Sequence, residues 1–298
     1  MIPTYKRTDS LKKLLDCLGK QEDIDLEIII VDQNAPDFFT EAFLSKLTKF
    51  TYIHQSQPNA SLARNNGFKI STAPYVLFID DDLLPDPDFC IKGVTIFNNY
   101  PLVKCFVPMV YTEDEKGLWI KKNKKKIKSA YPGNDLIFSI TDNISAAVFF
   151  ERSYYKLSGG FDPYLFEFAK ASEDVELFLR MQQNKLVLWF VSFLEIFHDE
   201  KSEGGCEMRT AGYWVSREKN ARAMALRLRI HNKASGNLSI ANIIQLSRSY
   251  IFNKAVLKSG LYTIIKEAKL LTNAIKESKI FYNKHKKYYS NNPIDFLL

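Results

Sequence analysis

The chain has 298 residues, of which 46% are hydrophobic and 13% aromatic, and its formal net charge is +7. This composition supports a substantial core and excludes an intrinsically disordered chain, while the length fits one large α/β domain with an appendage or two modest domains. The positive charge favours a polyanionic partner such as a nucleic acid, a phosphorylated ligand or an anionic membrane surface.

Features of the whole chain predict a soluble or peripheral protein in a reducing, cytoplasmic compartment. The chain opens on Met1 to Tyr5 and then charges, rather than on a signal peptide. The longest apolar run, residues 186–197, contains Glu195 and falls short of the ~20 residues of a membrane helix. The cysteines are far apart without metal-ligand spacing, which predicts free thiols; they are Cys17, Cys90, Cys105 and Cys206.

Strand and helix signals alternate through the first eighty residues. A short strand at residues 2–5 precedes a helix whose leucines recur at helical spacing until Gly19, and a β-branched strand follows at 26–31. A short helix at 40–47, a strand near 52–53 and a helix starting within 59–67 lead to an apolar strand at 75–79. This order predicts a parallel sheet with right-handed crossovers.

Three carboxylates, Asp80, Asp81 and Asp82, directly follow that apolar strand. Open α/β sheets bind ligands at the carboxyl ends of their strands. Adjacent acids against a core repel one another, so a cation such as Mg²⁺ or Mn²⁺, with phosphates, would stabilise them. The alternative is a solvated turn that caps a helix, because Asp and Pro residues continue the stretch.

The rest of the chain predicts a second layer and then a helical region. We expect a helix at 88–98, strands at 102–110 and 144–150, and a last strand at 186–197. Between the last two strands we expect a helix that begins with Ser172 as its cap. The basic stretch Lys121 to Lys128 predicts a loop that serves solubility or attracts phosphate. From about residue 207 the pattern is helical, so we place the domains at 1–204 and 205–298.

The order of motifs resembles family 2 glycosyltransferases of the GT-A fold over roughly residues 1–200. The resemblance implies an α/β, Rossmann-like, mainly parallel mixed sheet flanked by helices, here with a helical C-terminal extension. It also implies an inverting enzyme that transfers sugar from a nucleotide-diphosphate donor to a hydroxyl of a glycan or lipid-linked glycan. The matching motifs are Ile2-Pro3-Thr4-Tyr5, Val31-Asp32, Ala63-Arg64-Asn65-Asn66-Gly67, Asp80-Asp81-Asp82, Gly159-Gly160-Phe161-Asp162, Glu173-Asp174 and His198.

The resemblance assigns roles to the polar residues of these motifs. Asp82 and Asp80, completed by His198, would hold Mn²⁺ or Mg²⁺, which neutralises the leaving diphosphate. Asp174 would be the base that takes the acceptor's proton, and Glu173 would orient the acceptor. On position alone, the last two acids could instead complement the dipole of a helix.

The donor nucleotide would meet a second set of residues. Asp32 would contact the base, and a carboxylate can accept the imide N–H of uracil or thymine, which favours a UDP-sugar or dTDP-sugar. The turn after it reads Gln-Asn-Ala-Pro rather than the commoner Asp-Gly-Ser type, so the choice of nucleotide stays open. The full predicted donor set is Pro3, Tyr5, Asp32, Arg64, Asn65, Asp80 and Asp81.

Two other readings of the sequence compete with the transferase. A magnesium-dependent phosphatase of the haloacid-dehalogenase type also places Asp-x-Asp after a buried strand, but it needs a small residue where Leu84 stands. The tail at residues 280–289 mixes Lys with Tyr and Phe, as in a basic binding module. It could bind single-stranded nucleic acid, lie on an anionic membrane such as the inner face of the plasma membrane, or cap the catalytic domain; nucleic acid is the less favoured partner.

Overall fold

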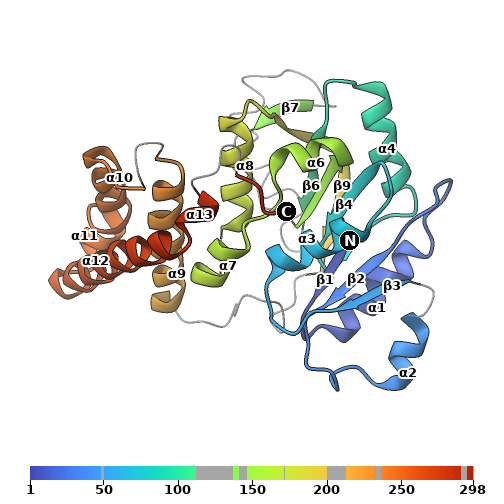
Figure 1. Cartoon of the computed structure of the whole chain (residues 1–298), viewed down its shortest axis with the longest axis horizontal. Helices are drawn as coiled ribbons and strands as arrows, with labels where there is room; N and C mark the ends of the chain where they lie inside the picture. The colour runs from blue at the N-terminus through green and yellow to red at the C-terminus, as the bar shows by residue number, and fades with distance from the viewer. Residues whose placement is uncertain are drawn as a thin grey trace.

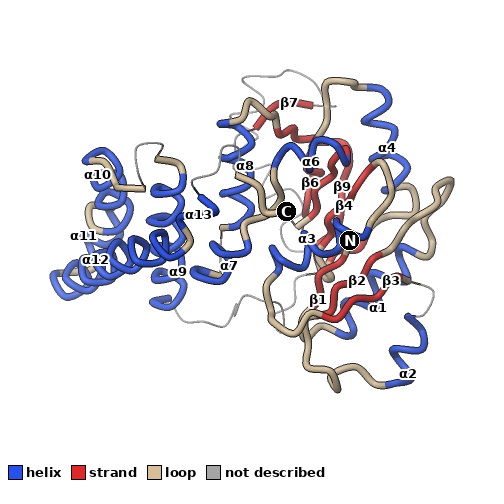
Figure 2. Tube along the Cα trace, in the orientation of Figure 1, coloured by secondary structure: helices blue, strands red, loops and turns tan. Residues whose placement is uncertain are grey.

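A computed structural model of the chain describes residues 1–47, 50–111, 137–140, 146–170, 172–199, 213–232, 236–289 and 294–297. A sheet with helices around it forms one side of the molecule, and a bundle of helices forms the other (Figure 1). Strands and helices alternate through the first part of the chain, and the described residues after 212 are helical or irregular (Figure 2). The predicted α/β class with a helical C-terminal extension is confirmed.

The N-terminal part forms a parallel three-stranded sheet in the order β1-β2-β3. Helix α1 buries its leucines at the predicted helical spacing, and the Asn59 side chain accepts a hydrogen bond from the backbone N–H of Leu62, which caps α3. The elements are β1 (Ile2–Thr4), α1 (Thr8–Leu18), β2 (Ile29–Asp32), α2 (Glu41–Leu44), the 3-10 turn η1 (Ser45–Leu47), β3 (Thr51–His54) and α3 (Ala60–Ile70).

A second sheet has the order β4-β8-β6-β9-β5, with β7 also paired to β9. Met1 joins it to the first sheet, since its amino group donates to the Leu77 carbonyl at 2.8 Å and its carbonyl accepts from Ile79 N–H at 3.1 Å. Its strands are β4 (Tyr75–Ile79), β5 (Leu83–Leu84), β6 (Cys105–Tyr111), β7 (Ile137–Ile140), β8 (Ala147–Glu151) and β9 (Leu188–His198).

The expectation of a mainly parallel sheet holds for only part of the molecule. In the second sheet β6 and β9 run parallel, whereas the other described pairs, β4–β8, β6–β8, β5–β9 and β7–β9, are antiparallel. The sequence did not reveal this, because a strand buried on both faces is apolar throughout whichever way its neighbours run. Strand β8 is such a case: residues 147–150 are all buried.

Helices α4 (Phe89–Asn99), α6 (Arg152–Ser158), α7 (Pro163–Ala169) and α8 (Glu173–Gln183) follow within the same domain. Aromatic rings join them to the sheet: Phe78 of β4 lies 4.7 Å from Tyr155 of α6 and 5.6 Å from Phe161, centroid to centroid. All three side chains are fully buried. This packing fixes the segment between α6 and α7 against the strand that leads to the acidic triplet.

The C-terminal extension contains α9 (Tyr213–Ile230), α10 (Ile240–Tyr250), α11 (Lys254–Lys258), α12 (Leu261–Lys284) and α13 (Lys286–Tyr289). It shares a buried cluster with α7 of the preceding domain, which includes Leu165, Leu226 and Tyr282. The last described residues return to that domain, where Phe296 N–H donates to the Gly159 carbonyl at 2.8 Å. The predicted boundary at 204/205 lies outside the described residues and stays a prediction.

The tail at residues 280–289 packs against the catalytic domain through its aromatic rings. Tyr282 and Tyr289 are buried and stack with centroids 5.5 Å apart, while Tyr288 stacks on Tyr164 at 4.4 Å. The tail is therefore a cap on the catalytic domain. Residues Lys121 to Lys128 lie outside the described part of the chain.

Two further observations concern membranes and thiols. None of the helices in the described ranges is both long enough and apolar enough to span a bilayer. Cys17, Cys90 and Cys105 are free thiols, as predicted, and Cys206 lies outside the described residues.

Candidate active site

The acidic triplet occupies the carboxyl end of β4, between that strand and β5. Asp81 and Asp82 are 3% and 1% exposed, whereas the Asp80 side chain keeps 32% of its surface. A solvated turn would expose all three side chains, so burial of two of them favours the ligand-site reading. Buried carboxylates require partners, and the structure shows which groups supply them.

Arg7, which follows β1, is the cation at the centre of the triplet. Its Nη1 lies 3.0 Å from Asp81 Oδ1 and 2.6 Å from Asp82 Oδ2. Burial alone would lower the pKa of Arg7, but the two carboxylates outweigh this effect and raise it, so the guanidinium stays charged. The sequence reasoning missed Arg7, although its place after the first parallel strand puts it at the same sheet edge as the acids.

Thr4 also contacts the triplet, donating from Oγ1 to Asp81 Oδ2 at 2.8 Å. Burial raises the pKa of Asp81 to about 6, even though Arg7 and the Thr4 hydroxyl stabilise its charged form. Thr4 lies opposite Asp32 in the pairing of β1 with β2. Asp32 and Asp81 thus belong to one continuous edge of the sheet.

Asp82 and His198 form the pair that best fits a divalent metal. Pairing of β5 with β9 sets Leu83 opposite His198, and the His198 Nε2 lies 3.1 Å from Asp82 Oδ1. Two adjacent ligands of an octahedral Mg²⁺ or Mn²⁺, each at about 2.1 Å, lie about 3.0 Å from one another. The spacing of these two atoms therefore suits ligands of one ion.

Asp80 is paired with a different group. Its Oδ1 lies 2.8 Å from Arg64 Nη2. Across the described ranges, no group of three or more His, Cys, Asp and Glu side chains is spaced to hold a metal. The structure thus brings together two of the three predicted ligands, because the Arg64 guanidinium holds the third.

Arg64 connects the triplet to the predicted catalytic acids. It is 4% exposed, its Nη1 lies 3.3 Å from Glu173 Oε1, and its guanidinium stacks 4.9 Å from the centre of the Phe161 ring. Burial by itself would lower the pKa of Arg64, but Asp80, Glu173 and Asp174 reverse the effect and raise it. Residues from three distant segments therefore meet around one cation.

Glu173 and Asp174 lie in the first turn of α8, as predicted. The Asp174 side chain is half-buried and its Oδ1 accepts a hydrogen bond from Val175 N–H at 2.7 Å. The expected cap differs: Ser172 has a left-handed backbone with φ of 66° and makes no capping hydrogen bond through its side chain. The helix therefore begins without a side-chain cap from Ser172.

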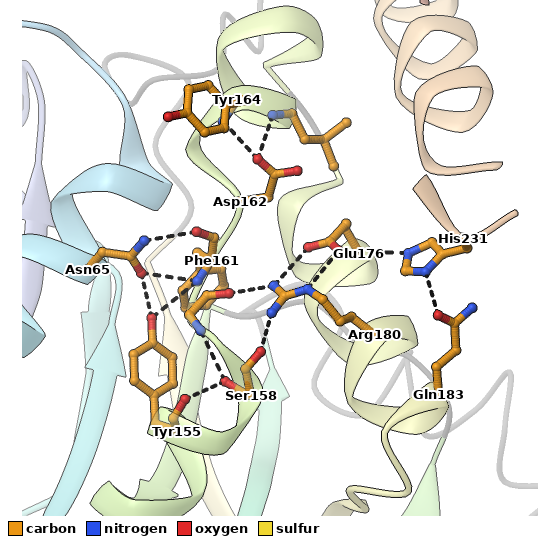
Figure 3. Close-up of polar contacts among 12 residues, drawn as sticks. Asn65, Tyr155, Ser158, Phe161, Asp162, Tyr164, Glu176, Arg180, Gln183 and His231 are labelled. Atoms are coloured by element: carbon orange, nitrogen blue, oxygen red, sulfur yellow. Dashed lines mark hydrogen bonds and ion pairs between the residues drawn. The ribbon is translucent and has the colours of Figure 1, made fainter. Parts of the chain in front are cut away.

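An ion pair within α8 holds the helix to the segment that precedes α7 (Figure 3). Arg180 Nε lies 2.9 Å from Glu176 Oε1, and its Nη2 lies 3.0 Å from Oε2, with both side chains almost wholly buried. The same guanidinium donates to the carbonyls of Ser158 and Gly160. Helix α8 is thereby fastened to the turn at Gly159 and Gly160, both of which have positive φ.

Asn65, which is predicted to contact the donor, takes part in a buried hydrogen-bond network. It is 1% exposed, and its Oδ1 accepts from the Tyr155 hydroxyl at 2.8 Å and from Phe161 N–H at 3.0 Å (Figure 3). Its Nδ2 donates to the Phe161 carbonyl at 2.9 Å. Both ends of the amide are used to hold the segment that carries Phe161 beneath Arg64.

The remaining predicted donor residues lie along the edge formed by β1 and β2. Asp32 is 2% exposed; its Oδ1 accepts from Asn34 N–H at 2.9 Å, and its Oδ2 accepts from the Tyr52 hydroxyl. Pro3 is buried within β1, and Tyr5 follows the strand half-buried. Burial and the bond to Asp32 raise the pKa of Tyr52, so its hydroxyl stays protonated.

The fold places the chain in a known structural class. It resembles the structure of S. aureus TarS residues 1–349 in complex with UDP-GlcNAc, with a TM-score of 0.63 and 17% identity over 93% of this chain and 79% of that chain. It also resembles the mannosyltransferase PcManGT from Pyrobaculum calidifontis in complex with GDP-Man and Mn²⁺, with a TM-score of 0.57 and 13% identity over 98% and 80% of the two chains. The fold is therefore that of the GT-A glycosyltransferases.

The family follows from the sequence match. Residues 1–158, more than half of the chain, match the family model described as Glycosyl transferase family 2, and the chain belongs to this family. It is 32% identical over 118 residues to the uncharacterized glycosyltransferase YibD of Escherichia coli, covering 38% of this chain and 34% of that protein. It is 33% identical over 91 residues to the poly(ribitol-phosphate) beta-N-acetylglucosaminyltransferase TarP of Staphylococcus aureus, covering 28% of each. The matched part thus spans about a third of these relatives or less.

Proposed function

We propose that this protein is an inverting glycosyltransferase that moves a sugar from a nucleotide-diphosphate donor to a hydroxyl of a glycan or lipid-linked glycan. The observation that carries the proposal is the meeting of the acidic triplet, Arg64 and the Glu173-Asp174 pair at one edge of the sheet. This constellation joins carboxylates that suit a divalent cation, with two arginines beside them, to a carboxylate that can act as a base.

Asp82 and His198 would hold Mn²⁺ or Mg²⁺ in this enzyme. Such an ion, when bound, stabilises the negative charge of the departing nucleoside diphosphate. Arg64 and Arg7 are the chain's own cations at the same place, and both are already paired with carboxylates of the triplet. Their positive charge opposes the effect of burial, which raises the pKa of Asp80 and of Asp81, and it limits repulsion between these acids and the phosphates.

Asp174 would take the proton from the acceptor hydroxyl as the hydroxyl oxygen bonds to the anomeric carbon. In the same step the bond between that carbon and the diphosphate oxygen breaks, and the electron pair leaves with the nucleotide. Attack from the face opposite the leaving group inverts the anomeric configuration. Glu173, held 3.3 Å from Arg64, would orient the acceptor beside the base.

We favour UDP or dTDP as the nucleotide and the cytoplasm, or the inner face of the plasma membrane, as the location. Asp32 lies at the end of β2, beside the turn at Asn34. There its carboxylate could accept a hydrogen bond from the imide N–H of a pyrimidine base. The likeness to TarS in complex with UDP-GlcNAc supports a UDP-sugar, whereas the likeness to PcManGT in complex with GDP-Man marks the alternative. The free thiols agree with a reducing compartment.

Donor hydrolysis tests the proposal without knowledge of the acceptor. With water as acceptor, Mn²⁺ and an α-linked UDP-sugar panel, we expect UDP release with the β-anomer as the first sugar product in proton NMR. Asp82→Asn should lower this release by about 10²-fold or more, because it removes a charged ligand of the ion. The exposed Asp86→Asn provides the matched control and should act as the wild type. A first product with retained α configuration would contradict the inverting mechanism.

A further inference from the structure

Large apolar side chains gather on one exposed part of the C-terminal extension. This part, residues 239–266, comprises α10, α11 and the start of α12 at the end of the molecule farthest from the sheet (Figure 1), and we name it the apolar tip. It holds eight of the eighteen large hydrophobic side chains that are exposed in the described residues. They are Ile240, Ile243, Ile244, Phe252, Leu257, Leu261, Tyr262 and Ile265, and Ile240, Leu261 and Tyr262 are more than 70% exposed.

The helices of the apolar tip bury only part of their apolar surface. On α10, Leu246 and Tyr250 are buried in the bundle, while Ile240, Ile243 and Ile244, near the N-terminal end of the helix, are exposed. The buried positions of α12 begin at Glu267, so its first turn and a half extend past the bundle. Large exposed apolar surfaces of soluble proteins commonly mark a site of contact with a protein or a membrane.

The charge of the apolar tip selects the partner. Residues 239–266 contain Arg248, Lys254, Lys258 and Lys266 but no Asp or Glu, which gives a formal charge of +4. Packing two copies through this surface would bring +4 against +4. An anionic bilayer offers negative headgroups to the basic side chains and hydrocarbon to the apolar ones.

We propose that the apolar tip is a docking surface for an anionic lipid bilayer. The contact is peripheral: the helices lie on the surface, and their exposed isoleucines and leucines enter the boundary between headgroups and acyl chains. The proposal replaces residues 280–289 as the membrane-binding segment, because Tyr282 and Tyr289 of that tail are buried. It does not depend on glycosyl transfer, and it would keep a lipid-linked acceptor near the catalytic domain.

Vesicle sedimentation of the full chain tests the proposal. We expect the wild type to sediment with vesicles of phosphatidylglycerol and phosphatidylcholine and to remain in solution with phosphatidylcholine alone. The triple variant Ile243→Ser, Leu261→Ser, Ile265→Ser should lose at least about tenfold in partitioning, because each side chain no longer enters the hydrocarbon. The matched control Leu102→Ser, Leu157→Ser, Ile280→Ser changes equally exposed side chains elsewhere and should sediment as the wild type.

A second variant separates charge from apolar contact. Lys254→Gln with Lys258→Gln should weaken sedimentation with anionic vesicles severalfold and reduce its salt dependence, since each basic residue contributes separately. Equal sedimentation of the triple variant and the wild type would overturn the proposal, as would equal binding to neutral vesicles. Light scattering covers the remaining outcome. If the wild type is an oligomer that does not bind vesicles, and the triple variant is a monomer, the apolar tip would be the contact with a second copy of the chain, which would overturn the proposal.

Discussion

Replacing Asp174 with Asn is expected to lower kcat of sugar transfer by about 10²- to 10⁴-fold, the contribution typical of a positioned general base. The amide has nearly the shape of the carboxylate but cannot take the acceptor's proton. Donor binding should change little, because Arg64 makes its direct contacts with Asp80 and Glu173 rather than with Asp174. The measurement is steady-state kinetics together with donor titration by calorimetry.

Variants of two other acids, Glu167 and Glu173, serve as comparisons for this test. Glu167 is an exposed acid of α7 and provides the control. Replacing it with Asn or Gln should leave kcat unchanged. Glu173→Gln should raise KM for the acceptor more than it lowers kcat, because Glu173 orients rather than deprotonates. Turnover at the wild-type rate in Asp174→Asn would remove that residue from the role of base, and loss of donor binding would point to a structural role.

Replacing Arg180 with Met is expected to lower the free energy of unfolding by about 3–5 kcal/mol, the range for breaking one side of a buried ion pair. Arg180 is 2% exposed and Glu176 is 0% exposed, so the substitution leaves a carboxylate without its cation inside the protein. It also removes the donors that bind the carbonyls of Ser158 and Gly160. Urea unfolding followed by circular dichroism measures the change.

Two further variants show whether the loss comes from the isolated charge. Glu176→Leu combined with Arg180→Met should recover part of the stability, because the Glu176 carboxylate is then no longer buried without its cation. Lys92→Met breaks an exposed pair with Asp88, whose side chains are 58% and 48% exposed, and should change stability by less than about 1 kcal/mol. A loss below about 1 kcal/mol in Arg180→Met would contradict the role that we give to this ion pair.

Most of the strands and the place of the acidic triplet could be predicted from the sequence because each depends on local pattern, whereas β5 and β7 were not predicted. Five apolar residues before Asp80 form β4, and a carboxylate that follows a buried strand must lie at its carboxyl end. His198 could be placed for the same reason, since it ends β9. The meeting of Asp82 with His198 came from the resemblance, because pairing of the two-residue strand β5 carries no sequence signal of its own.

The parts that the sequence could not supply depend on long-range contacts. Arg7 and Arg64 look alike as basic residues near a helix start, and only the structure shows that one binds Asp82 and the other Asp80. Asn65 lies in the same motif as Arg64, but its side chain binds the Tyr155 hydroxyl and the Phe161 backbone, whereas the Arg64 side chain binds Asp80 and Glu173. The tail at residues 280–289 has a mixed pattern that fits burial or exposure, and stacking on Tyr164 decides for burial.

The measurement that tests the central claim most directly is thermal unfolding with UDP, dTDP, GDP and CMP, each with and without Mn²⁺. A ligand that binds only the native state at 100 times its Kd adds about 2.7 kcal/mol of stability, so a donor site raises the Tm. We predict a metal-dependent increase with UDP or dTDP that is lost in Asp82→Ala and reduced in His198→Ala. The absence of any increase with all four nucleotides, or an equal increase in Asp82→Ala, would contradict a nucleotide-sugar site at the acidic triplet.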